Sequence, residues 1–159
     1  MEDLLPVRVT ADCPSIPSIL ELIQRTFAFM EPRINPPSSM HRLTVEKIQD
    51  QCSEGEIWAI GERPSACVFL SAKSEYLYIG KLAVQEDMRG RGLARSLVDL
   101  AEQRARSRGL SGLELETRIE LIENHETFRR LGFVKTGESI HDGFDRPTSI
   151  TMRKPIKVK

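Results

Sequence analysis

The chain has 159 residues, of which 40% are hydrophobic and 29% charged, and this composition predicts one compact domain, residues 1–159, with a substantial core. Lys plus Arg and Asp plus Glu both number 23, so no overall positive field favours nucleic acid or an anionic membrane as a partner. The sequence has no apolar run of roughly 20 residues that could span a membrane, and its N-terminus does not resemble a signal peptide. We therefore expect a cytoplasmic protein in which any anion site is local.

The cysteines indicate free thiols. Cys13, Cys52 and Cys67 are odd in number and widely separated, and they form no Cys-x-x-Cys pair and have no nearby histidine. A disulfide framework or a zinc site would need a different spacing. We therefore expect no metal cofactor.

Apolar spacing predicts the secondary structure of the first half of the chain. Alternation marks a first strand, and apolar residues three or four apart mark an amphipathic helix that ends before the prolines at 32, 36 and 37. A turn-like segment, residues 61–65, separates two strands and predicts a hairpin. The expected elements are strand 7–9, helix 16–29, helix 44–51, and strands 57–60, 67–70 and 76–84, the last three forming an antiparallel meander.

The second half of the chain alternates between helices and strands. Apolar residues from Leu93 to Ala105 form a helical stripe that Gly109 closes, and strand 113–117 follows. A crossover of this length predicts that strand 113–117 lies parallel to strand 76–84. The remaining expected elements are helix 122–131 and strands 133–140 and 149–153, which enclose an irregular loop at residues 141–147.

The connection between strand 76–84 and the next helix has the composition of an anion site. It reads QEDMRGRG, residues 85–92, and leads directly into the helix. The first N–H groups of a helix have no intrahelical partner and lie at the positive end of its dipole. Gly90 and Gly92 carry no side chain, so a phosphate can approach the backbone closely. The arginines that add positive charge here are Arg89, Arg91 and Arg95.

Spacing excludes the common phosphate loops and leaves one resemblance. Arg95 stands where the dinucleotide fingerprint has its third glycine, and no Gly-Lys-Ser/Thr of a P-loop follows. The pattern R-x-x-G-x-A after Leu-Ala-Val, within residues 82–94, is similar to the acyl-CoA signature of the GNAT superfamily of N-acyltransferases. A second segment, FRRLGF at residues 128–133, is similar to the Tyr-x-x-x-Gly-Phe end of the last major helix in that family.

The resemblance implies the GNAT fold, an α/β (α+β) domain with a central mixed, mostly antiparallel sheet, a splayed parallel strand pair and flanking helices. In that family the strand before the glycine turn pairs with the pantetheine amides through its backbone, and one of its N–H groups polarises the thioester carbonyl. By position, Leu82 would supply that N–H. The residues that the resemblance places against acetyl-CoA are Leu82, Ala83, Val84, Arg89, Gly90, Arg91, Gly92, Leu93, Ala94, Arg95 and Phe128.

Acetyl transfer to an amine requires the uncharged amine. With a lysine-like pKa of about 10.4, only about one molecule in 10³ to 10⁴ is neutral at pH 7, which costs about 4–5 kcal/mol unless a base removes the proton. The resemblance aligns Glu116 with a glutamate that several family members use as this base, often through water. Because Glu114 and Glu116 share one face of an alternating strand, the alternative is that both belong to a solvated face.

Phe128 departs from the family pattern. Many relatives have a tyrosine there, whose hydroxyl reprotonates the departing CoA thiolate, and phenylalanine has no proton to give. A thiol with a pKa of about 8.5 can also leave as its anion, and help from an acid is worth about 10²–10⁴-fold, so transfer is not abolished. The other candidate donors are water, Tyr76, Tyr78, His125 and Ser39.

The resemblance implies an acetyl-CoA-dependent N-acetyltransferase (EC 2.3.1 type) in which a primary amine of a small molecule or peptide attacks the thioester directly in a ternary complex. In this fold the acceptor pocket is walled by the loop between the first two helices and the loop between the last two strands, here residues 29–39 and 141–147. The charge in the second loop favours a polar acceptor. The alternative function is a non-catalytic acyl-CoA sensor or regulatory module, which is conceivable because Phe128 lacks the hydroxyl that serves as the acid in many relatives. The acceptor, the acyl length and the oligomeric state stay open, a homodimer included.

Overall fold

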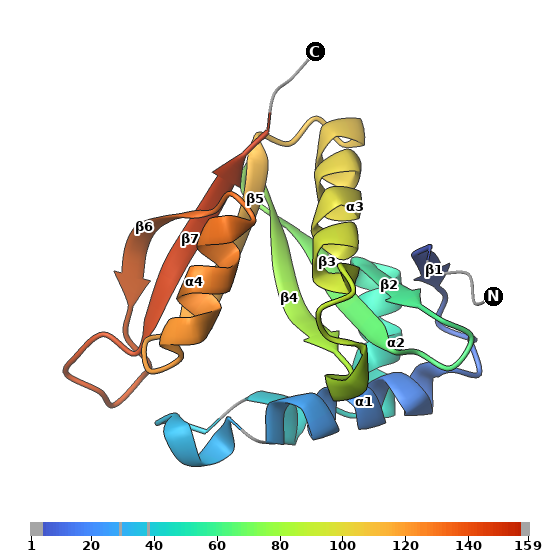
Figure 1. Cartoon of the computed structure of the whole chain (residues 1–159), viewed down its shortest axis with the longest axis horizontal. Coiled ribbons are helices and arrows are strands. Elements are labelled where there is room, and N and C mark those ends of the chain that lie inside the picture. The colour runs from blue at the N-terminus through green and yellow to red at the C-terminus, as the bar shows by residue number, and fades with distance from the viewer. Residues whose placement is uncertain (1–4, 29, 38, 157–159) are drawn as a thin grey trace.

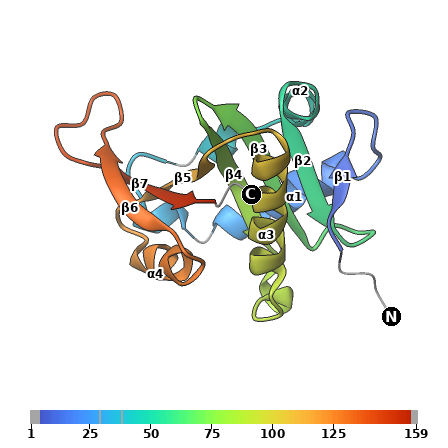
Figure 2. The same ribbon diagram turned by 90° about the horizontal axis from the view of Figure 1, so that it is seen from above.

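The computed structural model describes residues 5–28, 30–37 and 39–156. Within these residues, seven strands form one sheet in the order β1-β2-β3-β4-β5-β7-β6, in which β4 and β5 are parallel and all other neighbours antiparallel (Figures 1 and 2). The strands are β1 (Val7–Val9), β2 (Glu56–Ile60), β3 (Ala66–Lys73), β4 (Tyr76–Val84), β5 (Gly112–Arg118), β6 (Val134–Ser139) and β7 (Ser149–Pro155).

Helices connect these strands in the order that the sequence predicts. The α-helices are α1 (Ile16–Ala28), α2 (Val45–Glu54), α3 (Leu93–Ser107) and α4 (Ile122–Arg130), and short 3-10 turns are η1 (Glu31–Arg33), η2 (Ser39–Arg42) and η3 (Glu86–Met88). The expected fold class is confirmed, and the bounds of the elements differ from expectation by only a few residues at their ends. None of the helices in the described ranges is long and apolar enough to cross a membrane.

The sheet separates two apolar cores. One core lies under α1 and α2, and the other lies under α3 and continues to the end of α4. Within β3, Val68 packs into the α3 core, whereas its neighbours Cys67 and Phe69 pack into the α1–α2 core. Successive strand residues point to opposite faces, so a continuous apolar run can serve both layers.

The parallel strands β4 and β5 pair over only part of their length. Their ladder joins Tyr76, Leu77 and Tyr78 to residues 112–114 and then ends, although β4 continues to Val84 and β5 to Arg118. Figure 1 shows the two strands diverging toward the end where α1 crosses below them. The splayed pair that the family resemblance implies is therefore present.

A bulge interrupts β4 at the point of divergence. Cys67 of β3 faces Ala83, but Phe69 faces Gly80, so Lys81 and Leu82 together oppose Val68. Lys81 has a left-handed backbone with φ of 47°, an uncommon value for a residue with a side chain. A bulge of this kind bends its strand and redirects its side chains. The bulge thus aims Lys81 and Leu82 differently from a regular strand.

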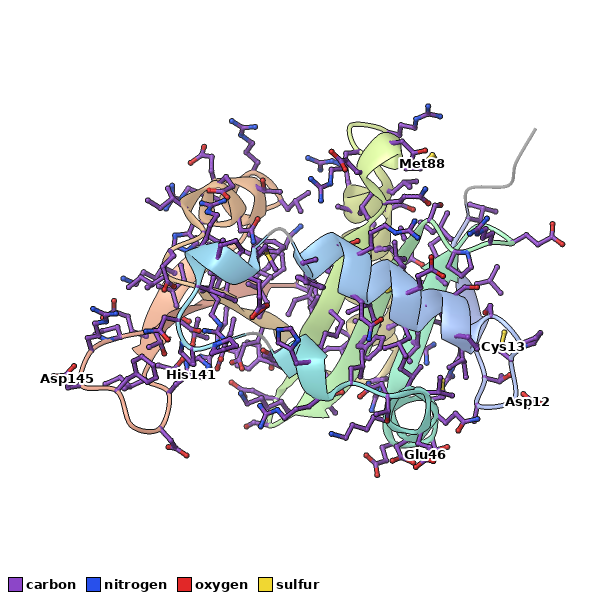
Figure 3. The ribbon with its side chains drawn as sticks, turned by 90° about the horizontal axis from the view of Figure 1, so that it is seen from below. Asp12, Cys13, Glu46, Met88, His141 and Asp145 are labelled. Carbon is purple, nitrogen blue, oxygen red and sulfur yellow. The ribbon has the colours of Figure 1, made fainter. Side chains whose placement is uncertain are left out.

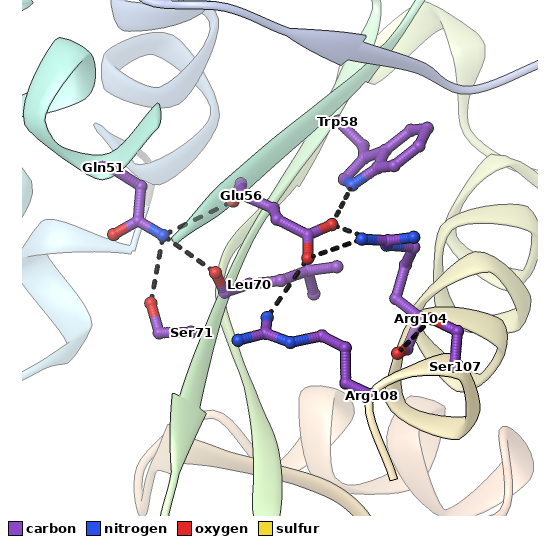
Figure 4. A network of polar contacts seen from close by, with 8 residues as sticks. All are labelled: Gln51, Glu56, Trp58, Leu70, Ser71, Arg104, Ser107 and Arg108. Atoms are coloured by element: carbon purple, nitrogen blue, oxygen red, sulfur yellow. Dashed lines mark hydrogen bonds and ion pairs between the residues drawn. The ribbon is translucent and has the colours of Figure 1, made fainter. Parts of the chain in front are cut away.

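A buried carboxylate joins α3 to strand β2. Glu56 of β2 is 4% exposed and accepts hydrogen bonds from Trp58 Nε1 at 2.8 Å and from Arg104 Nε at 2.8 Å (Figure 4). Arg108 Nη1 donates to the same carboxylate at 3.1 Å. Burial alone would raise the pKa of Glu56, but the hydrogen bonds from Arg104 and Trp58, together with the positive charges of Arg104 and Arg8, outweigh burial and hold this pKa below its usual value.

Candidate active site

A cleft of about 480 Å³ opens where β4 leads into α3, with α4 and the end of α1 completing its walls. The residues assigned to acetyl-CoA that line it are Leu82, Val84, Arg89, Gly90, Gly92, Leu93, Ala94, Arg95 and Phe128. The structure thus gathers most of the predicted set around one space, which we call the thioester cleft after the group that the sequence resemblance predicts there. Ala83 and Arg91 do not line it, because Ala83 is buried in the α1–α2 core and Arg91 is exposed to solvent.

The start of α3 presents backbone to this cleft. Gly90 and Gly92 have φ of +79° and +78°, and a Cβ built on either glycine would meet no described atom within 4 Å. The left-handed backbone favours glycine, and the open space lets a ligand approach. Because Gly92 is the N-cap of a 15-residue helix, the first N–H groups of α3 point toward this space. The geometry suits a phosphate or pyrophosphate group.

A second cleft, of about 650 Å³, lies across the splayed strands and reaches the loops that follow α1 and β6. We call it the acceptor cleft. The residues that line both clefts are Phe27, Met30, Leu82, Asn124 and Phe128. The two spaces therefore meet beside the β4 bulge, where a group bound in one can reach a group bound in the other.

Glu116 and Glu114 have different environments although they share one face of β5. Glu116 is exposed and lines the acceptor cleft. Glu114 is 5% exposed, and its carboxylate lies 2.9 Å from Arg153 Nε and 3.3 Å from Lys73 Nζ. The alternative that both glutamates belong to a solvated face is wrong for Glu114, which is buried beside these two cations. Catalysis by Glu116 stays a prediction.

Phe128 lies between the two clefts. Its ring is partly buried and contacts the buried Phe133 edge to face, with 5.9 Å between the ring centroids. Among the other candidate proton donors, Tyr78 lines the acceptor cleft, whereas His125 and Tyr76 line neither cleft. Burial raises the pKa of Tyr78 to about 12, so its hydroxyl stays protonated at neutral pH. The side chain of Ser39 lies outside what the structure describes.

The loops expected to wall the acceptor site contribute only in part. Residues 30, 34, 36 and 37 of the first loop line the acceptor cleft, whereas residues 29 and 38 lie outside the described part of the chain. Arg33 instead donates hydrogen bonds to Glu123 of α4, which hold the pKa of Glu123 at about 2. From the second loop, His141 and Asp142 line the cleft, but Asp145 lies at the outer tip (Figure 3).

The acceptor cleft contains positive charge that was not predicted from the sequence. Arg42 of η2, Lys81 of the bulge and Arg118 at the end of β5 all line it. The available signal was the polar pair Gly80-Lys81 in an otherwise apolar strand. Arg42 and Arg118 carried no such signal, because the tertiary fold alone brings them to this place.

The remaining titratable clusters do not form a metal centre. No group of three or more His, Cys, Asp or Glu side chains within the described ranges is placed to hold a metal ion. The thiols of Cys13, Cys52 and Cys67 are all free. Cys67 is fully buried, and this burial raises its pKa to about 12, so its thiol is not a nucleophile at neutral pH.

Comparisons with known proteins agree with the geometry. The model of the acetyltransferase (GNAT) family matches residues 16–133. The chain is 40% identical over 62 residues to acetyltransferase Atu2258 of Agrobacterium fabrum, a match that covers 39% of this chain and 44% of that protein. It is 26% identical over 156 residues to an IAA acetyltransferase of Azospirillum brasilense, covering 94% of this chain and 98% of that protein.

The fold itself has many solved counterparts. A GNAT-family acetyltransferase from Staphylococcus aureus Mu50 superposes with a TM-score of 0.74 at 14% sequence identity, covering 96% of this chain and 99% of that one. At this level of identity the likeness concerns the fold alone. It agrees with the mixed sheet and the flanking helices described above.

Proposed function

Because this chain belongs to the acetyltransferase (GNAT) family, we propose that it moves the acetyl group of acetyl-CoA to a primary amine by direct attack in a ternary complex. Residues 1–159 would act as one catalytic domain, in the cytoplasm, as the sequence analysis expects. The observation that carries the proposal is the meeting of the thioester and acceptor clefts at Leu82 and Phe128. Two substrates held in these clefts would place an amine against a thioester without any covalent enzyme intermediate.

The thioester cleft fits coenzyme A. Its phosphates would bind at the start of α3, where Gly90 and Gly92 leave the backbone open and Arg89 and Arg95 line the cleft. The pantetheine arm would run along β4 beyond Tyr78, where the ladder with β5 has ended. A strand edge in this state can hydrogen-bond an extended ligand as a further strand would.

The transfer step needs a base, a polarising donor and a leaving thiolate. In the proposed reaction, Glu116, directly or through water, accepts the proton of the ammonium, and the free amine nitrogen then forms a bond to the thioester carbon. The Leu82 N–H would stabilise the oxyanion of the tetrahedral intermediate. The C–S bond then breaks, the acetyl group stays on nitrogen, and the second proton of that nitrogen passes through water to the departing thiolate, which leaves as the free thiol. Phe128 would pack beside the sulfur without supplying that proton.

The test is the release of free thiol from acetyl-CoA over a panel of primary amines, with the acetylated amine identified by mass spectrometry. We expect continuous release that depends on both the amine and the enzyme concentration. Binding of CoA without release by any amine would instead support the non-catalytic sensor and would sink the proposal of turnover.

A further inference from the structure

The acceptor cleft gathers positive charge from three distant parts of the chain. Arg42, Lys81 and Arg118 line it together, and among the described residues Glu116 and Asp142 are the carboxylates in its lining. No local basic run explains this cluster, since the three cations come from η2, from the β4 bulge and from the end of β5. The fold therefore assembles the charge at this place.

Arg118 and Arg42 lie near enough to Lys81 for their charges to act on it. Burial lowers the pKa of Lys81, and the charges of Arg118 and Arg42 lower it further. Burial also lowers the pKa of Arg118, although Glu120 and Glu31 act in the opposite direction. Positive charge is therefore costly in this part of the cleft, and a bound anion would reduce that cost.

Backbone contacts fix the orientation of Arg118. Its Nη1 donates to the carbonyl of Pro36 at 2.6 Å, and its Nη2 donates to the carbonyl of Pro37 at 2.9 Å. The carbonyls add no formal charge, so they hold the guanidinium in place while it keeps its full positive charge. A cation preorganised on the end of a strand is suited to binding an anionic group.

Another part of the same lining is apolar. Met30, Ile34 and Leu121 are each at most 8% exposed and form a small core of their own. Phe27 and Phe128 extend this apolar lining toward the junction with the thioester cleft. A ligand that fits the whole acceptor cleft therefore combines an apolar group with a negative charge.

We propose that the acceptor is a small amine with a carboxylate near its amino group and an apolar side chain, in chemical class an apolar amino acid, whose carboxylate binds Arg42, Lys81 and Arg118. This inference rests on the proposed function, because it names the acceptor of the same site. Exposed Glu116 lies in the same lining and would receive the proton of the amino group.

The first experiment compares leucine with leucinamide and 3-methylbutylamine, which keep the apolar group and lack the carboxylate. The amide has the less basic amine, so chemistry alone would favour it. We expect kcat/KM for leucine to exceed both by about tenfold or more, because a charge-assisted contact is lost without the carboxylate. Equal or better use of the uncharged analogues would overturn the proposal. The phosphonate analogue of leucine separates the two kinds of anion, and a preference for it would overturn the carboxylate assignment.

The second experiment uses Arg42→Met, which removes an exposed cation from the cleft, and Lys81→Met, which keeps a side chain at the bulge. Each should lower the ratio of kcat/KM for leucine to that for leucinamide by about tenfold while KM for acetyl-CoA is kept. Lys47→Met is the matched control, because Lys47 is exposed on α2 and lines neither cleft. If the ratio of kcat/KM for leucine to that for leucinamide is unchanged in both cleft variants, the proposed anion subsite is wrong.

A binding measurement separates failure of this inference from failure of the proposed function. The acid 4-methylpentanoate keeps the carboxylate and apolar group of leucine but has no amine to acetylate. We expect it to raise the melting temperature of the wild type but not of Arg42→Met. If no amine is acetylated yet this difference is seen, the proposed turnover fails and the anion subsite stands. If amines are acetylated and the difference is absent, only the subsite fails.

Discussion

At the scale of single residues, the proposed role of Glu116 as the base can be tested by a substitution that leaves the fold intact. Glu116→Gln keeps the volume of the side chain but cannot accept a proton, and the site is exposed, so folding should be little affected. We expect kcat to fall about 10²-fold or more near neutral pH with little change in KM for acetyl-CoA.

Two other glutamates provide the controls for Glu116. Glu62→Gln, in the exposed β2–β3 turn, should leave kcat unchanged. Glu114→Gln should lower the melting temperature, because it removes the partner of Arg153 and Lys73. If Glu116→Gln turns over as fast as the wild type, Glu116 is a solvated residue of β5 and another base must be sought.

Phe128 gives a second prediction at this scale. Phe128→Tyr adds a hydroxyl at the junction of the two clefts, where the ring is only partly buried, so kcat should rise or stay level and the melting temperature should change little. Phe133→Tyr is the matched control, because its ring is 0% exposed and a new hydroxyl there should cost about 1–3 kcal/mol of stability. Marked destabilisation of Phe128→Tyr without kinetic gain would remove residue 128 from the site.

Sequence alone could not separate Glu114 from Glu116. Both stand on one face of an alternating strand, and alternation reports which face a residue occupies, not what covers that face. Glu114 is buried because Arg153 of β7 and Lys73 of β3 lie beside it, and such partners come from other parts of the sheet. The strand that carries both glutamates was predicted correctly, whereas the burial of Glu114 could be seen only in the tertiary structure.

At the scale of elements, the start of α3 carries a prediction about coenzyme A. We expect CoA to raise the melting temperature of the wild type but not of Gly92→Glu, because this substitution puts a negative side chain into the thioester cleft. The substitution also strains a left-handed backbone with φ of +78°. Gly109→Glu controls for this strain, since Gly109 has φ of +69° and equal open space but lines neither cleft. If CoA stabilises both variants equally, the phosphates do not bind at the start of α3.

Most elements follow from the sequence, because apolar periodicity sets their type and glycines and prolines set their ends. Strand β4 was predicted with its full range, Tyr76–Val84, and its parallel alignment with β5 was predicted from the length of the crossover. The bulge at Lys81 was not predicted. A bulge depends on the register with β3, which no spacing within β4 reveals. The positive charge of the acceptor cleft was not predicted either, because Arg42 and Arg118 come near Lys81 only in the folded chain.

At the scale of the whole molecule, the proposed reaction centre and the buried carboxylate that joins β2 to α3 lie in different places. Both clefts are lined by Leu82, in the part of β4 that has diverged from β5 (Figure 1). The Glu56 carboxylate instead joins β2 to the C-terminal end of α3 through Arg104 and Arg108 (Figure 4). Neither cleft is lined by these three residues. Stability and catalysis should therefore respond to different substitutions.

Glu56→Gln tests this separation. It leaves two guanidinium groups beside a neutral amide, and we expect a loss of about 2 kcal/mol, below the roughly 3–5 kcal/mol of a fully buried pair, because Arg104 and Arg108 are 30% and 35% exposed. The pKa of Glu56 is lower in the folded protein than in the unfolded chain, where it is 4.5 in the absence of shifts. The stabilisation that Glu56 provides is therefore complete above pH 4.5 and is lost as the pH falls through the pKa of the folded protein. The difference in melting temperature between wild type and variant should therefore be largest near pH 7 and shrink as the pH falls below 4.5. At temperatures where both proteins are folded, kcat should be equal. A loss of kcat without a loss of stability would show that the Glu56 network influences the proposed reaction centre.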